Sequence, residues 1–369
     1  MCAAERVSVA LDRKAGPARR KRTLAARLAL AGASLLLALV VVEIGFRAGR
    51  GPPWYERVVE EQTTFRPTRW RVGRITAPLR GPLDTGPKGP DTRRILFLGD
   101  SFTYGHGLAE PAKTFVGLVA ERFNQQQPCP PARRCEVFNG GMPGTFTGEW
   151  VILFEDAVDP FAPDLVVAVF FLRDAVAGTT SMQQIDKIRD GMRRLAGESL
   201  LFRYSHTYRY FREHSELAEL SHKYLEHIRA GYLGSADQTR EWQRAQVNLL
   251  TINRQTLERG ARFAVVIFPV LIELHERYPL AGVCEVIEDF CRDHEIPALS
   301  LLPTFMNKSA PSLWVSPCDQ HPNERGHALA AAAIYEFLEP LLCTAPGSDD
   351  ATGASYRSVE DRADRKTLP

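Results

Sequence analysis

Short apolar runs rich in branched residues alternate with helical patterns along the middle of the chain. We expect strands near 94–99, 135–138, 165–171, 263–268 and 298–301, and helices near 112–125, 147–158, 239–260, 281–293 and 324–341. Alternation of this kind predicts an α/β fold with a parallel sheet covered by helices on both faces. In such sheets, binding and catalytic sites form outside the carboxyl ends of the strands.

Residues 175–238 break this alternation. They contain SLLFRYSHTYRYF, a run that is both aromatic and basic. We expect a mostly helical insertion over one edge of the sheet. The polar stretch 344–369 reads as a disordered tail, and residues 47–91, rich in Gly, Pro and Arg, read as a linker before a domain at 92–343.

A long apolar run, LALAGASLLLALVVVEIGF, occupies residues 28–46 and carries one charge, Glu43. Nineteen helical residues span roughly 28 Å, close to the hydrocarbon thickness of a bilayer. Seven Lys or Arg precede the run within twenty residues and four follow it, so the positive-inside rule predicts a cytoplasmic segment at 1–27 and a domain on the outer, periplasmic side of the inner membrane. A cleaved signal peptide and a buried core helix are the alternatives.

Composition and charge narrow the possible function classes. Of the 369 residues, 44% are hydrophobic and 24% are charged, which excludes a chain that is disordered throughout. The net charge of +2 gives no field that would favour nucleic acid. Six cysteines follow the apolar run, an even number that is compatible either with disulfides outside the cell or with six reduced thiols; their spacing does not predict a metal site.

Two segments carry candidate chemistry. Ser101 follows the first predicted strand directly, in Gly99-Asp100-Ser101, where its hydroxyl can face a cleft and its N–H can point at a developing oxyanion. Asp319 stands two residues before His321, so the pair can supply a base and the carboxylate that orients it. Taken singly, these segments can also be a helix N-cap and a helix-capping loop. The other histidines, His106 and His327 among them, read as surface or packing residues.

The three segments ILFLGDSFTYGHG, FNGGMPG and SPCDQHPNERGH together resemble the SGNH/GDSL hydrolases over about residues 92–340. The resemblance implies a flavodoxin-like three-layer α/β/α sandwich, with Ser101 as nucleophile and Asp319 and His321 completing a triad. It also implies that the N–H of Gly141 joins that of Ser101 in the oxyanion hole. Arg173 stands where the family places an Asn whose side chain donates to the oxyanion, so it is the third candidate for the oxyanion hole, although its guanidinium is longer and charged. We expect it to act mainly in catalysis, and to be paired with a group such as Asp174 or to reach water or an anionic substrate group.

These expectations describe an anchored serine esterase that acts on an ester-bearing substrate, such as an acylated saccharide or lipid, without metal or other cofactor. Two alternatives remain at the level of the sequence. The same acyl-enzyme could transfer its acyl group to an envelope polysaccharide, or the domain could bind envelope components without catalysis.

Overall fold

The computed structural model describes residues 17–49, 68–84, 86–176, 197–316 and 319–343, together with 190–191 and 194–195. The predicted tail at 344–369, residues 1–16 and 50–67 of the predicted cytoplasmic segment and linker, and Cys318 lie outside these residues. The chain forms two compact units, residues 1–53 with 187–217 and residues 54–186 with 218–369.

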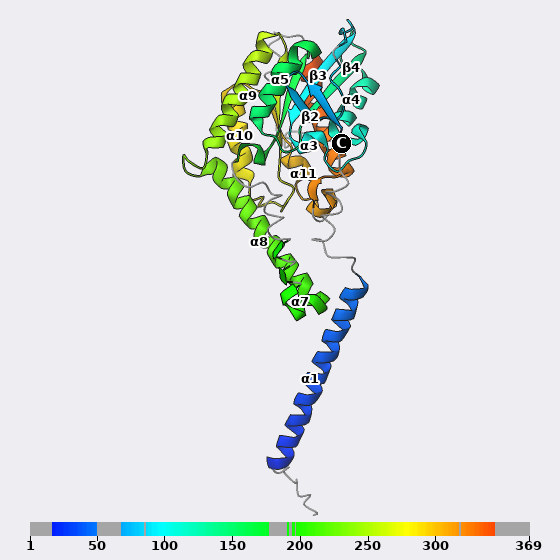
Figure 1. The fold of residues 1–369 in the computed structure, drawn as a ribbon, viewed down its shortest axis with the longest axis vertical. Coiled ribbons are helices and arrows are strands. Elements are labelled where there is room, and N and C mark those ends of the chain that lie inside the picture. The colour runs from blue at the N-terminus through cyan, green and yellow to red at the C-terminus, as the bar shows by residue number, and fades with distance from the viewer. Residues whose placement is uncertain are drawn as a thin grey trace, which may run out of the picture. The chain divides into compact units, whose positions relative to one another are not determined.

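Five parallel strands form the centre of the second unit, in the order β4-β3-β5-β6-β7 (Figure 1). The central strand β5 is buried at every position, as its unbroken apolar sequence predicts. The order corresponds to the 2-1-3-4-5 order of flavodoxin-like sheets, so the predicted fold is confirmed. The strands are β3 Thr92–Gly99, β4 Arg134–Gly141, β5 Leu165–Phe171, β6 Arg262–Phe268 and β7 Ala298–Ser300.

Helices cover both faces of this sheet, and each has an apolar side that faces the core. Helices α4 and α12 pack together on one face, while α5 and α9 pack together on the other, where Trp242 of α9 also stacks edge-on against Phe290 of α10. The helices are α4 Phe115–Gln126, α5 Thr147–Phe161, α9 Arg240–Glu258, α10 Ala281–Asp293 and α12 Glu324–Cys343, with shorter pieces at η1 Pro111–Lys113, α11 Leu302–Phe305 and η3 Ala310–Leu313.

Part of the predicted linker is folded onto the domain. Strands β1 (Arg69–Val72) and β2 (Ile75–Pro78) form an antiparallel hairpin. The hairpin turn is held on α5, because Arg74 donates its backbone N–H and its Nε–H to the two carboxylate oxygens of Asp156, at 2.7 and 2.8 Å. Val72 is buried in the same core as the sheet. Linker-like composition therefore did not reveal a hairpin of four-residue strands that tertiary contacts stabilise.

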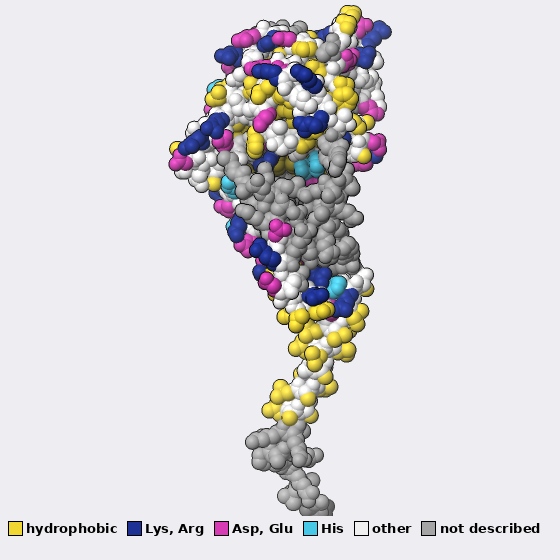
Figure 2. All heavy atoms as spheres, viewed as in Figure 1, with side chains coloured by type: hydrophobic (Ala, Val, Ile, Leu, Met, Phe, Trp, Pro, Cys, Tyr) yellow, Lys and Arg dark blue, Asp and Glu magenta, His cyan; other side chains and the backbone are white. Residues whose placement is uncertain are grey.

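One helix among the described residues is long and apolar enough to cross a membrane. It is the segment Leu24–Ala48 of α1 (Pro17–Ala48), and none of its apolar window is buried against protein. Figure 2 shows hydrophobic side chains exposed along it. The predicted insertion is helical where it is described, in α7 (Leu200–Tyr204) and α8 (His206–Leu233).

Two contacts hold α12 against α4 and the loop that follows α4. Cys129, in the loop after α4, forms a disulfide with Cys343 at the end of α12, a pairing that cysteine spacing did not indicate. His327 is fully buried and its Nδ1 accepts the backbone N–H of Phe115 at 3.0 Å, so its expected packing role is confirmed. The other described cysteines, Cys135, Cys284 and Cys291, are buried free thiols.

Candidate active site

Ser101 lies at the carboxyl end of β3, as the first residue of the short helix α3 (Ser101–Tyr104). Asp100 caps this helix, because its Oδ1 accepts the N–H of Phe102 at 2.8 Å. The turn needs glycine at position 99, since a Cβ there would lie 2.0 Å from Oγ1 of Thr103. Ser101 is buried, with 8% of its surface exposed.

Asp319 and His321 lie on β9 (Asp319–Pro322), which pairs with β8 (Trp314–Ser316) in a hairpin. Nδ1 of His321 is 2.5 Å from Oδ1 of Asp319, and its Nε2 is 2.8 Å from Oγ of Ser101. Asn323 fixes the end of this hairpin by donating from Nδ2 to the carbonyl oxygens of Ser312 and Trp314. The structure thus brings the pair Asp319 and His321 to Ser101, although Ser101 and His321 lie 220 positions apart in the sequence.

The contacts of Asp319 favour one tautomer of His321. Burial would raise the pKa of the Asp319 carboxyl, but the hydrogen bonds and charge of His321 outweigh burial and lower it. An ionised carboxylate only accepts hydrogen bonds, so Nδ1 of His321 carries the proton and Nε2 is left as an acceptor. The Ser101 hydroxyl can then donate to Nε2, which is the arrangement that a general base needs.

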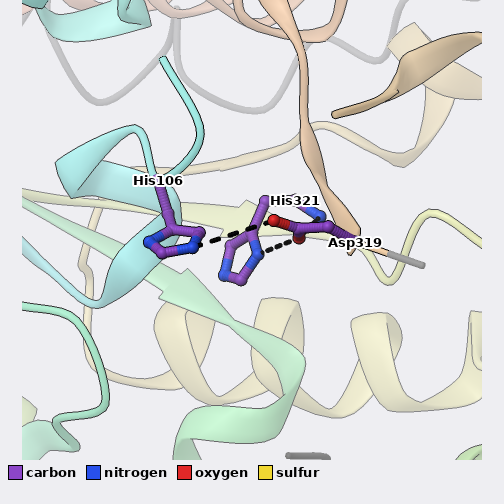
Figure 3. A group of neighbouring side chains, drawn as sticks. All are labelled: His106, Asp319 and His321. Carbon is purple, nitrogen blue, oxygen red and sulfur yellow. Dashed lines mark hydrogen bonds and ion pairs between the residues drawn. The ribbon is translucent and has the colours of Figure 1, made fainter. Parts of the chain in front are cut away.

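His106, which we expected to be a surface or packing residue, lies beside this pair (Figure 3). Its Nε2 is 3.7 Å from Oδ2 of Asp319, and its ring centroid is 4.6 Å from that of His321. Burial, reinforced by His321, lowers the pKa of His106 to about 4, so the ring is neutral near pH 7. The signal in the sequence that could have found it is its position five residues after Ser101, which places it just beyond the end of the one-turn helix α3.

The expected oxyanion donor Gly141 is engaged elsewhere in this structure. Its N–H donates to Oδ1 of Asn139 at 3.0 Å, while Nδ2 of Asn139 donates to the carbonyl oxygen of Thr103 at 2.9 Å. A Cβ at position 141 would lie 2.2 Å from the backbone nitrogen of Tyr104, so glycine is required here for close packing of β4 against α3. The role that the structure gives Gly141 is therefore this close approach.

Arg173 follows β5 in the short helix η2 (Leu172–Ala175) and is paired on both sides. One guanidinium nitrogen lies 3.2 Å from Oδ2 of Asp100 and 3.4 Å from Oδ1 of Asp174. Both carboxylates are buried, and burial together with Asp100 raises the pKa of Asp174 well above its usual range. Oδ2 of Asp100 also lies 3.3 Å from Oγ of Ser101, so Arg173 is connected to Ser101 through Asp100. The expected pairing with Asp174 is present, and Asp100 is a second partner.

This pairing predicts that Arg173 affects stability as well as catalysis. Arg173→Ala leaves the buried Asp100 carboxylate without its cation and the Asp174 carboxyl without that hydrogen-bond donor, and we expect the free energy of unfolding to fall by about 3–5 kcal/mol. We expect kcat and kcat/KM to fall together, because Asp100, which caps the helix that begins at Ser101, then loses the cation that positions it. Urea unfolding and ester kinetics on Arg173→Ala, Arg173→Asn and Arg173→Lys measure both effects.

Arg259→Ala is the matched control, because Arg259 pairs with Asp159 on the surface at 2.7 Å. An exposed pair of this kind contributes under about 1 kcal/mol. If Arg173→Ala were no less stable than Arg259→Ala, the contacts of Arg173 with Asp100 and Asp174 would contribute nothing measurable to the free energy of unfolding.

His106, Asp319 and His321 are the described residues whose ligand atoms come close enough together, within 4.8 Å, to hold a metal ion. A metal there would have to replace the contact between His321 and Asp319. That the enzyme uses no metal cofactor therefore stays an expectation, which rests on the hydrogen bond between His321 and Asp319.

Comparison with known proteins places this site in a described family. The model of the GDSL-like lipase/acylhydrolase family matches residues 97–329, a range that includes Ser101, Asp319 and His321. No curated protein matches the sequence significantly.

Solved structures of esterases resemble the chain at low identity. A two-domain esterase active on acetylated mannans is 16% identical over 70% of this chain and 52% of its own, with a TM-score of 0.41, so this chain spans about half the length of that esterase. A lipase/acylhydrolase from Enterococcus faecalis is 17% identical over 69% of this chain and 99% of its own, with a TM-score of 0.40. A catalytic mutant of an acetylxylan esterase from Geobacillus stearothermophilus is 15% identical over 69% and 96%, with a TM-score of 0.39.

Proposed function

The chain belongs to the GDSL-like lipase/acylhydrolase family and is an ester-hydrolysing enzyme, and we propose that it works as a membrane-anchored serine esterase outside the cytoplasm. The observation that carries the proposal is the continuous line of contacts from Asp319 through His321 to Ser101, at 2.5 and 2.8 Å. Each contact joins groups whose chemistry suits the next step of acyl transfer.

In the proposed mechanism, Oγ of Ser101 attacks the carbonyl carbon of an acyl ester while Nε2 of His321 takes the hydroxyl proton. The tetrahedral intermediate collapses, the C–O bond to the alcohol breaks, and His321 returns the proton to the leaving alkoxide. Water, activated by the same nitrogen, then releases the acid from Ser101. Asp319 stabilises the imidazolium and keeps Nδ1 protonated throughout.

The oxyanion is assigned first to the backbone N–H of Ser101, which belongs to the first turn of α3 and has no helical acceptor. The N–H of Gly141 can donate to the oxyanion only if it first gives up its hydrogen bond to Oδ1 of Asn139. Arg173, engaged by Asp100 and Asp174, supports this arrangement through the position of Asp100 rather than by direct donation.

Two features support the proposed location of the enzyme. The apolar segment of α1 has a strongly basic stretch before it, which favours a cytoplasmic N-terminus. The Cys129–Cys343 disulfide favours an oxidising compartment for the catalytic unit. We therefore propose a single-pass inner-membrane protein whose catalytic unit is periplasmic.

Two measurements test the proposal. A periplasm-dependent phosphatase fused after Pro369 should be active, whereas a reporter that works only in the cytoplasm should be silent; the reverse result contradicts the location. Incubation with a chromogenic acetyl ester should release acetate, with and without an added saccharide. Appearance of acetylated saccharide in place of acetate would instead identify the enzyme as an O-acyltransferase.

A further inference from the structure

Glu43 is the single charge in the apolar run, and it caps a helix from a distant part of the sequence. Its carboxylate accepts hydrogen bonds from the N–H of His206 at 2.7 Å, from the N–H of Thr207 at 3.0 Å and from Oγ of Ser205 at 2.9 Å. Arg47 pairs with the same carboxylate at 3.0 Å. These groups all belong to the first compact unit, so the start of α8 is fixed to the last turns of α1.

The length of α1 sets the depth of this junction. A hydrocarbon core of about 30 Å takes about 20 helical residues, so the 25 residues of Leu24–Ala48 are longer than the core and Glu43, five residues from the end, lies near its boundary. The last turn of α1, up to Ala48, then lies among the lipid headgroups. A carboxylate at the boundary, with four hydrogen-bonding partners, avoids the cost of a charge at the bilayer centre.

Residues 199–212 surround the residues that Glu43 binds, and they expose several large apolar and aromatic side chains. The same short stretch also carries three arginines. Aromatic rings with basic residues are typical of segments that lie in a membrane interface. The exposed apolar members are Leu200, Leu201, Tyr204, Tyr208 and Phe211, and the arginines are Arg203, Arg209 and Arg212.

We infer that residues 199–212, here called the interfacial segment, lie among the lipid headgroups on the side of the membrane where the C-terminal end of α1 emerges. The apolar side chains would reach the acyl-chain boundary, and the exposed Arg203, whose guanidinium lies over the Tyr204 ring, would bind lipid phosphates. Arg209 is held by the carbonyl oxygens of Phe202 and Arg203, and Arg212 pairs with Glu216. The inference rests on the proposed membrane span. The partner of the interfacial segment is the surface of a lipid bilayer, because Glu43 joins this segment directly to the end of that span.

The test uses the full chain in vesicles of phosphatidylcholine and phosphatidylglycerol, with or without bromine on the acyl chains to quench nearby tryptophan. Phe211→Trp reports on the interfacial segment, and Val247→Trp on α9 is the matched control, since the two positions are 63% and 62% exposed. Leu36→Trp, at a position 65% exposed within α1, reports on the span itself. Fluorescence of the unsubstituted chain is subtracted, and ester hydrolysis checks that each variant is folded.

We expect the added tryptophan at 211 to lose at least twice the fraction of fluorescence lost at 247, and the one at 36 to be quenched as well. Quenching at 36 without excess quenching at 211 would overturn the inference and leave the anchor standing. Absence of quenching at 36 would overturn the proposed anchor, and the inference with it, while leaving the serine esterase mechanism untouched. If a second protein or a second copy of this chain covered the segment, position 36 would be quenched without excess quenching at 211.

Discussion

Ser101→Ala is expected to abolish ester hydrolysis, with kcat falling by about 10⁶-fold, the scale seen when a serine nucleophile is removed from a comparable triad. No other described hydroxyl occupies its place at 2.8 Å from Nε2 of His321. The loss should appear in steady-state hydrolysis of a chromogenic acetyl ester. A fluorophosphonate probe, which labels only an activated serine, should mark the wild-type chain and leave Ser101→Ala unlabelled.

Folding must be unchanged for this result to have meaning. Ser101 packs at the start of a one-turn helix whose cap comes from Asp100, so removal of its hydroxyl should alter the free energy of unfolding by less than about 1 kcal/mol. Ser235→Ala, on the turn before α9, is a matched control that should keep full activity and labelling. Turnover that survives in Ser101→Ala would remove the serine mechanism.

Asp319→Asn is expected to lower kcat by about 10⁴-fold, although the size and shape of the side chain are kept. An amide nitrogen at this position would donate to Nδ1 of His321, so the ring would carry its proton on Nε2 and could no longer accept from Ser101. The comparison of kcat with thermal unfolding separates this tautomer effect from a loss of folding.

The neighbouring ring provides the contrast for this experiment. His106 reaches Asp319 only at 3.7 Å, and His106→Asn should therefore cost far less than Asp319→Asn. Asp237→Asn, in an exposed pair with Arg240, should have no effect on kcat. A loss of less than tenfold in Asp319→Asn would show that His321 is held by another group, and His106 would then be the first to examine.

The strands and helices of the sandwich could be predicted because each is encoded locally. The run at 165–171 is apolar at every position, and it forms a strand that is buried on both faces. Ser101, Asp319 and His321 could be predicted because short motifs place them at the ends of such elements. The hairpin at 69–78 could not be, since its strands are stabilised by α5, more than seventy residues away.

The finer arrangement of the site also depends on contacts that sequence neighbours do not reveal. Gly141 and Asn139 are two residues apart, yet only the side-chain geometry shows that one satisfies the other. Arg173 occupies a family position where Asn is expected, but its partner Asp100 lies 73 residues earlier, on another strand end. Such partners become visible only when the carboxyl ends of β3, β4 and β5 meet at one edge of the sheet.

The disulfide between Cys129 and Cys343 closes a covalent ring within the catalytic unit. Ser101 precedes the ring on the N-terminal side, whereas Asp319 and His321 lie inside it. A protease that cuts the backbone once at any point between the two cysteines would leave both pieces joined through the sulfur bridge. A nicked enzyme therefore keeps its serine and its histidine on a single covalent assembly, and it sheds no fragment into the surrounding medium until the bridge is also reduced.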